Sequence, residues 1–269
     1  MRGILSLAYI TFIEGIRSRA LFGIFIMALL MFAVTVTLTN LFMRDIVKVA
    51  ADLSLATISF SGLLMVIFIG NSLLSKDIDK RTIYMVISRP LSRTQYIWGK
   101  FAGIVMLVIA AVVFLGLISS LPVYFAGLTY ENPEAIFKWT IYFSAIALIA
   151  MKLALIASVT IFFSSFTSTS FISLMLTIAT YIIGASTETV KGFLDSRAGG
   201  VDISPLMGFV IKCVYYLFPN LATFDIKLQA SHGLLLPEGY FIWALVYWFF
   251  YAGILVSAAS LIMERREFP

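Results

Sequence analysis

Charged residues are scarce in this sequence. Only 12% of the 269 residues are Asp, Glu, Lys or Arg, whereas 61% are hydrophobic. A soluble domain usually has about 25% charged residues, because they cover its water-facing surface. The composition therefore predicts a membrane protein. The formal net charge of +5 fits this class, because multi-span proteins accumulate Lys and Arg in cytoplasmic loops, and we expect no nucleic-acid partner.

Cysteine and histidine each occur once, as Cys213 and His232. A disulfide within the chain and a His/Cys metal cluster are therefore excluded. Gly99-Lys100 is followed by Phe101 rather than by Ser or Thr, so the chain has no phosphate-binding loop. The hydrolase motifs GxSxG and HExxH are also missing. We expect a protein that is not an enzyme and holds neither a metal nor a cofactor of its own.

The dominant feature of the sequence is a series of long apolar segments. A membrane-spanning helix needs about 20 mostly apolar residues. The sequence therefore predicts an all-α membrane protein, a single domain over residues 1–269 with six transmembrane helices. The predicted spans are 21–43, 54–74, 99–121, 138–163, 169–187 and 240–263.

The N-terminal segment 3–19 is apolar on one side only. Residues 14–19 form a poor cleavage site for a signal peptide. On a helical wheel Thr11, Glu14 and Ser18 lie opposite the apolar face. This pattern predicts a helix that lies in the membrane interface, and a retained signal anchor is the alternative. The predicted apolar face consists of Leu5, Ala8, Tyr9, Phe12, Ile13 and Ile16.

The distribution of Lys and Arg predicts the orientation. With six spans, both termini and the 75–98 loop lie on one side, which then holds eleven basic residues. The other side holds seven, and four of these are in one long loop, where charge has less influence on topology. We therefore expect the termini and the 75–98 loop to be cytoplasmic. The eleven are Arg2, Arg17, Arg19, Lys76, Lys80, Arg81, Arg89, Arg93, Lys100, Arg265 and Arg266.

The predicted loops differ in size. Residues 44–53 and 122–137 form short external loops, whereas 188–239 form a large external loop before the last span. Within the large loop, the apolar run Met207–Leu217 is too short to span and predicts a re-entrant or interfacial helix. Pro219-Asn220 is expected to end that helix.

Lys152 is the clear charge inside a predicted span, about fourteen residues into the fourth. A charge at this depth costs about 2.5–3.5 kcal/mol on insertion scales. Two interpretations are open: a polar lining of a translocation path or an interhelical pair, or else snorkelling or a bond to a carbonyl. No acidic residue within the spans is an obvious partner, which argues against a proton-coupled carrier. Gly99 and Gly103 match a close-packing pattern that also arises by chance.

The 75–98 loop concentrates charge between two apolar spans. Thr82–Ser88 is predicted to form a short helix that Pro90 ends, and Ser92 or Thr94 can cap the following segment, which enters the membrane at Trp98. A short helix held between two spans suits contact with a soluble partner. The alternative is a basic loop that touches anionic membrane lipid.

The amino-acid sequence of this loop resembles the corresponding loop in the permease subunits of type-2 ABC exporters. Those subunits carry an acidic and Thr-containing element, then S-R-P-[VLI]-[ST]-R, and then G-K. The corresponding residues here are Lys76-Asp77-Ile78-Asp79-Lys80-Arg81-Thr82, Ser88-Arg89-Pro90-Leu91-Ser92-Arg93 and Gly99-Lys100. Pro219-Asn220-Leu221 with Phe224-Asp225 is similar to the subgroup that contains the permease of the nitrous-oxide-reductase maturation exporter.

The resemblance implies a multi-pass protein of a prokaryotic inner membrane. Two permease chains would pair, as two copies or with a homologous permease. Two separate ATPase subunits would bind ATP and Mg²⁺, and a helix over 76–90 would dock on each. The residues implied in coupling are Lys76, Asp77, Asp79, Arg81, Thr82, Arg89, Pro90 and Arg93. Two alternatives stay open: a scaffold that passes ATPase motion to an external partner protein, and a secondary carrier.

Overall fold

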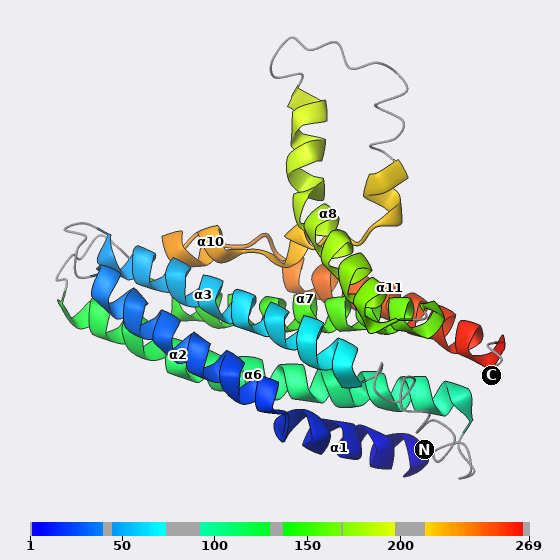
Figure 1. The fold of residues 1–269 in the computed structure, drawn as a ribbon. Helices are drawn as coiled ribbons and strands as arrows, with labels where there is room; N and C mark the ends of the chain where they lie inside the picture. Colours follow the sequence, from blue (N-terminus) through cyan, green and yellow to red (C-terminus); the bar gives the residue numbers. More distant parts are fainter. Residues whose placement is uncertain are drawn as a thin grey trace.

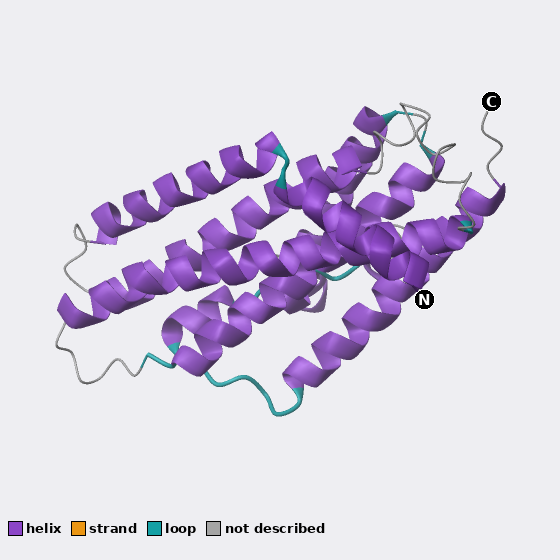
Figure 2. Ribbon diagram, turned by 90° about the horizontal axis from the view of Figure 1, so that it is seen from below, coloured by secondary structure: helices purple, strands orange, loops and turns teal. Residues whose placement is uncertain are grey.

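The computed structural model describes residues 2–39, 45–73, 92–129, 137–167, 169–196 and 213–265. Within these ranges all regular structure is helical (Figure 1, Figure 2). Six helices are long and apolar enough to cross a membrane, which confirms the predicted all-α membrane fold. They are α2 (Arg19–Thr39), α3 (Ile46–Met65) with its continuation η1 (Val66–Gly70), α6 (Arg93–Thr129), α7 (Trp139–Phe166), α8 (Ser170–Ser196) and α11 (Tyr240–Arg265).

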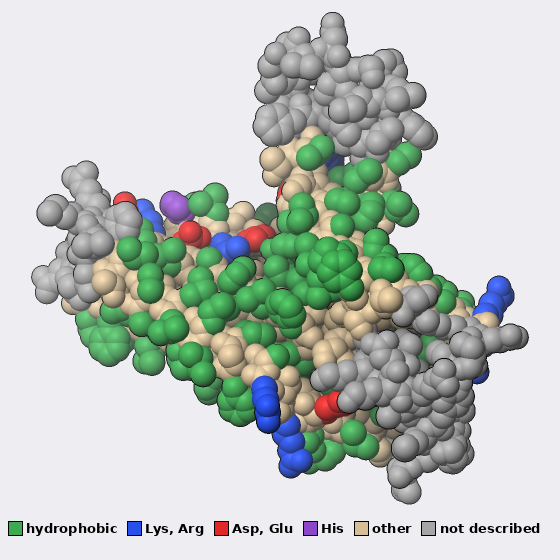
Figure 3. All heavy atoms as spheres, viewed as in Figure 1, with side chains coloured by type: hydrophobic (Ala, Val, Ile, Leu, Met, Phe, Trp, Pro, Cys, Tyr) green, Lys and Arg blue, Asp and Glu red, His purple; other side chains and the backbone are tan. Residues whose placement is uncertain are grey.

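The helices α2, α3, α6 and α7 run along the length of a bundle, and both chain ends lie at the same end of it (Figure 1). We call this the terminal end and the opposite one the far end. The helices α3 and α7 form the centre, where most of their residues are buried, whereas α2, α8 and α11 are mostly exposed. Exposed side chains on the long helices include Phe22, Leu30, Val113 and Ile254. Apolar side chains cover much of the visible surface (Figure 3), as expected for a multi-pass membrane protein whose outer face contacts lipid.

Two of the predicted short loops are partly helical. The helix α3 begins at Ile46, so most of the predicted 44–53 loop belongs to its first turns, in which Ala50 and Ala51 are buried. The helix α6 continues through Pro122 to Thr129, so the prediction that a loop begins at Pro122 was wrong. Proline is tolerated in membrane helices when neighbouring groups satisfy the freed backbone. Here the Tyr142 hydroxyl from α7 donates to the Ser119 carbonyl oxygen at 3.4 Å, one turn before Pro122.

The N-terminal helix α1 (Arg2–Ile16) packs along α6. A Cβ atom on Gly103 would lie 2.7 Å from the Ala8 carbonyl oxygen, and one on Gly99 would lie 2.8 Å from Leu7 Cδ2. The glycine pair is therefore a true helix contact, and the matching order of the partners makes the two helices parallel.

The face of α1 that packs on α6 combines Ala8, from the predicted apolar side, with Thr11, from the opposite side. Thr11 is fully buried, whereas Leu5, Tyr9 and Ile16 are exposed. The reason is that the surface of α6 offers glycines, and a close approach to glycine favours small side chains over large apolar ones. Leu5, Tyr9 and Ile16 thus face outward, whereas Leu7 is buried against Gly99. An interfacial position of α1 stays a prediction.

The helix α8 leans away from the bundle, and its second half lies beside the short helical segment 213–217 (Figure 1). It continues to Ser196, nine residues beyond the predicted end of the fifth span at residue 187. Residues 207–212 of the predicted Met207–Leu217 helix lie outside the described residues, and 213–217 are helical. This helix ends before Pro219, as predicted. The short elements η2 (Ala222–Phe224) and α10 (Lys227–His232) then precede α11.

Candidate functional site

Lys152 lies about halfway along α7 with a side chain that is only 3% exposed. Its ammonium nitrogen is 3.1 Å from Asp225 Oδ2. The partner that the spans lack is therefore supplied by a residue outside them. The acid comes from the segment between η2 and α10, which the sequence places in a loop outside the membrane. At a rise of about 1.5 Å per residue, Lys152 is roughly 20 Å from the start of α7, so this segment reaches well into the bundle.

Asp225 is shared by two lysines. The same oxygen, Oδ2, lies 3.3 Å from the Lys227 ammonium nitrogen, and the Lys152 ammonium also lies 5.6 Å from the centre of the Tyr181 ring of α8. Burial by itself raises the pKa of the Asp225 carboxyl, but the charges and hydrogen bonds of Lys152 and Lys227 outweigh it and hold the pKa below its ordinary value of 3.8. The Asp225 carboxyl is therefore ionised at neutral pH.

A compact turn positions Asp225. The backbone N–H of Leu221 donates to the Gly184 carbonyl of α8 at 3.0 Å, and the N–H of Asn220 donates to the Tyr247 hydroxyl of α11 at 2.9 Å. Phe224 is fully buried beside them. The turn is thus attached to two long helices, and Asp225 follows it directly. The resemblance included the Pro-Asn-Leu and Phe-Asp segments of this turn. It did not indicate the contact between Asp225 and Lys152.

Buried hydroxyl groups line the interface between α7 and α8. On α8 they follow one face at helical spacing, at Ser173, Thr177, Thr180 and Thr187. At the terminal end Ser173 Oγ lies 2.7 Å from Ser164 Oγ of α7, and the Ser164 hydroxyl donates to Asn71 Oδ1 at 3.4 Å. At the other end Thr187 donates to Asn220 Oδ1 at 3.3 Å. The bundle therefore has a polar seam beside Lys152 within an otherwise apolar interior. Asn71 directly follows the π-helical turn η1, a feature frequent at functional sites.

Seven of the eight residues implied in coupling lie outside the described residues. The exception is Arg93, the first residue of α6, whose guanidinium donates to the carbonyl oxygens of Met263 and Glu264 at 3.0 and 3.2 Å. These carbonyls belong to the last turn of α11, where a cation is favourable. Those outside are Lys76, Asp77, Asp79, Arg81, Thr82, Arg89 and Pro90.

The start of α6 is fixed by a capping box, as the sequence predicted for Ser92. The Ser92 hydroxyl accepts the backbone N–H of Gln95 at 3.2 Å, and the Gln95 side-chain oxygen accepts the N–H of Ser92 at 3.3 Å. Thr94 instead donates to the Glu264 carboxylate.

Lys100 holds the other end of the loop. Its side chain is 4% exposed, and its ammonium donates to the carbonyl oxygen of Leu73 at 3.1 Å. Leu73 is the last described residue before residues 74–91. The Lys100 ammonium also lies 3.8 Å from the Glu14 carboxylate of α1. Lys100 thus links α1, α6 and the end of the second span at one point. The sequence showed Lys100 as part of Gly99-Lys100 without indicating this role.

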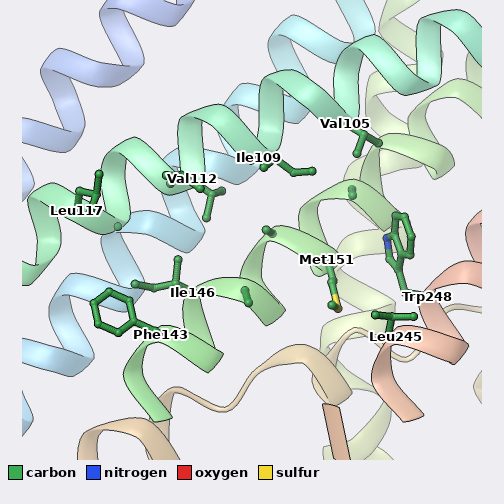
Figure 4. Close-up of a pocket in the computed structure, with 14 residues that line it drawn as sticks. Val105, Ile109, Val112, Leu117, Phe143, Ile146, Met151, Leu245 and Trp248 are labelled. Carbon is green, nitrogen blue, oxygen red and sulfur yellow. The ribbon is translucent and has the colours of Figure 1, made fainter. Parts of the chain in front are cut away.

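An apolar cavity of about 480 Å³ lies between α6, α7 and α11 (Figure 4). Its lining includes Ile109, Val112, Ile146, Met151 and Trp248. It lies among the long apolar helices and can accept hydrocarbon, but it has no group for acid–base chemistry.

Within the described ranges, no three His, Cys, Asp or Glu residues are grouped so that they could hold a metal ion. A scan against protein-family models and a search of curated proteins find no match for this chain.

Proposed function

We propose that this chain is the membrane-spanning subunit of an ATP-driven exporter of the type-2 ABC class. Two permease chains pair in a prokaryotic inner membrane, with both termini in the cytoplasm, and two separate ATPase subunits dock on residues 76–90. ATP binding and hydrolysis take place in those subunits, because this chain has no phosphate-binding loop. The resemblance of residues 76–100 supports the proposal on the sequence side.

On the structural side, the proposal is supported by the attachment of both ends of the 74–91 segment. Arg93 connects the outgoing end to the last turn of α11. Lys100 connects the incoming end, at Leu73, to α1 and α6. A displacement of the segment by a soluble partner would therefore act on α1, α3, α6 and α11 together. Transmission between two states needs such a contiguous connection of rigid helices.

The experiment purifies the chain from its native membrane together with its bound ATPase and measures ATP hydrolysis in nanodiscs. We expect Arg89→Glu to lower hydrolysis about fivefold or more, the lower bound of typical coupling between sites. Lys138→Glu is the matched control, because Lys138 precedes α7 at the far end of the bundle, and it should leave the rate unchanged. Absence of a bound ATPase, or equal rates in both variants, would contradict the proposal.

A secondary carrier is the second candidate, and the Lys152–Asp225 pair is the observation that favours it. Carriers commonly place an acid within the bundle, and Asp225 supplies one. Transport in ATP-free proteoliposomes that follows an imposed proton gradient would support this candidate over the exporter.

A further inference from the structure

The cluster Lys152–Asp225–Lys227 contains two lysines and one aspartate. Within the described residues, Asp225 is the one carboxylate within 4.0 Å of either ammonium group. A lysine that is 3% exposed cannot remain charged at this depth without an anion nearby, because burial of an unpaired charge costs several kcal/mol. Lys152 therefore requires an anionic group at the position of Asp225 Oδ2.

Asp225 occupies this position from outside the spans. It does not belong to a long helix but to the short connection between η2 and α10. The side chains of Asp225 and Lys227 are 30% and 25% exposed, so the cluster opens to the surface on their side and is closed only behind Lys152. Figure 3 shows acidic and basic side chains gathered there, in the angle between α8 and the part of the bundle that α10 covers. Asp225 and Lys227 are therefore partly exposed without separation of the central helices.

We infer that Lys152 and Lys227 form a binding site for an anionic group, a carboxylate or a phosphate, which the side chain of Asp225 occupies in this structure. An oxygen atom at the position of Asp225 Oδ2 accepts from two ammonium groups at 3.1 and 3.3 Å. Charge-assisted hydrogen bonds of this length are the strong ones in proteins. A ligand with such a group competes with the Asp225 carboxylate for the two ammonium groups.

The chemistry of the site does not depend on how the protein is powered. Its use for a transported ligand rests on the proposed function, and it implies cargo with a carboxylate or phosphate group. Binding of the anion itself is measured without ATP or an ATPase subunit. A negative result in the ATPase experiment therefore does not contradict the anion site. Failure to bind an anion likewise does not contradict the proposed coupling to an ATPase.

The test is chemical rescue of Asp225→Ala in detergent micelles. Removal of the carboxylate leaves space and an unpaired Lys152, so the variant should unfold at a lower temperature than the wild type. Acetate or inorganic phosphate, added at constant ionic strength against a bulky sulfonate, should then raise the unfolding midpoint saturably by at least about 3 °C. The wild type should respond less, because Asp225 already occupies the site.

Two controls identify the site. Lys152→Met/Asp225→Ala should show no response to acetate or phosphate, because the buried ammonium is gone. Asp45→Asn disrupts an exposed ion pair with Lys48, 2.8 Å long and solvated, and should show no response either.

The remaining outcomes depend on whether each variant can be purified from membranes in a folded form. If Asp225→Ala is recovered from membranes only in the presence of acetate or phosphate, the proposal is supported. If it is recovered but neither anion raises its midpoint, the proposal is overturned. It is also overturned if Asp225→Ala is recovered in no anion while Lys152→Met/Asp225→Ala folds, because the cluster then accepts its own carboxylate alone.

Discussion

Asp225→Asn should destabilise the protein more than Lys152→Met, although both changes break the same ion pair. Removal of the carboxylate leaves Lys152 3% exposed and without another anionic partner within the described residues. Removal of the lysine leaves Asp225 30% exposed and still 3.3 Å from Lys227. Water and Lys227 therefore stabilise Asp225 in the Lys152→Met variant. Neither is available to Lys152 in the Asp225→Asn variant.

The magnitudes follow from the distance and the burial. At 3.1 Å and an effective dielectric constant of about 20, the two charges attract by about 5 kcal/mol, of which desolvation of Lys152 offsets a large part. We expect a loss of about 3 kcal/mol for Asp225→Asn, the lower end for breaking one side of a buried pair. Lys152→Met should cost about 1 kcal/mol, and the double variant about 2 kcal/mol, because it leaves no unpaired buried charge.

The assay is equilibrium unfolding in mixed micelles, followed by circular dichroism, for the wild type, both single variants and the double variant. The expected coupling energy is about 2 kcal/mol. The exposed pair Lys48–Asp45 provides the comparison cycle, for which the coupling should stay below about 1 kcal/mol. Additive losses in the Lys152–Asp225 cycle, or a larger loss for Lys152→Met than for Asp225→Asn, would refute the reasoning.

Three further predictions concern the same contacts. Gly103→Ala should lower the unfolding free energy by about 1–3 kcal/mol, because its Cβ would lie 2.7 Å from the Ala8 carbonyl oxygen; Gly127→Ala on the same helix meets no atom within 4 Å and should be neutral or stabilising in the same unfolding assay. The depressed pKa of Asp225 stabilises the folded state at neutral pH, and this contribution should be lost as the pH falls below 3.8 in thermal melts of the wild type but not of Asp225→Asn. Arg93→Ala should speed hydrogen exchange in the last turn of α11, because two carbonyl oxygens lose their donor; unchanged exchange there would exclude a connection between the two helices.

The helices themselves could be predicted from local sequence, but their ends could not. Pro122 and the charged residues Lys48 and Asp52 favoured loops, yet helices continue through all three. A helix ends where its backbone groups find other partners or where its packing ends, and a hydropathy pattern records neither. The start of α6 was predictable because the capping box of Ser92 and Gln95 is a local signal.

The candidate site depended on contacts between distant parts of the chain. Lys152 and Asp225 are 73 positions apart, and the Arg93 side chain bonds a carbonyl 170 positions away. Lys152 stood out in the sequence because a charge in an apolar span is costly. Its partner did not, because an aspartate in a polar loop is ordinary in composition and only the turn at Asn220 brings it inward.

The sequence by itself determined that the chain is a multi-pass membrane protein. The small number of charged residues and the length of the apolar segments are local properties, and they decide whether a helix can cross a bilayer. It also determined that the given sequence contains no phosphate-binding loop motif. Only the tertiary structure decided which face of α1 packs on α6, which carboxylate neutralises Lys152, and which helices hold the two ends of the charged loop. The physical reason is that close packing and ion pairing depend on distances between segments, which one-dimensional patterns do not contain.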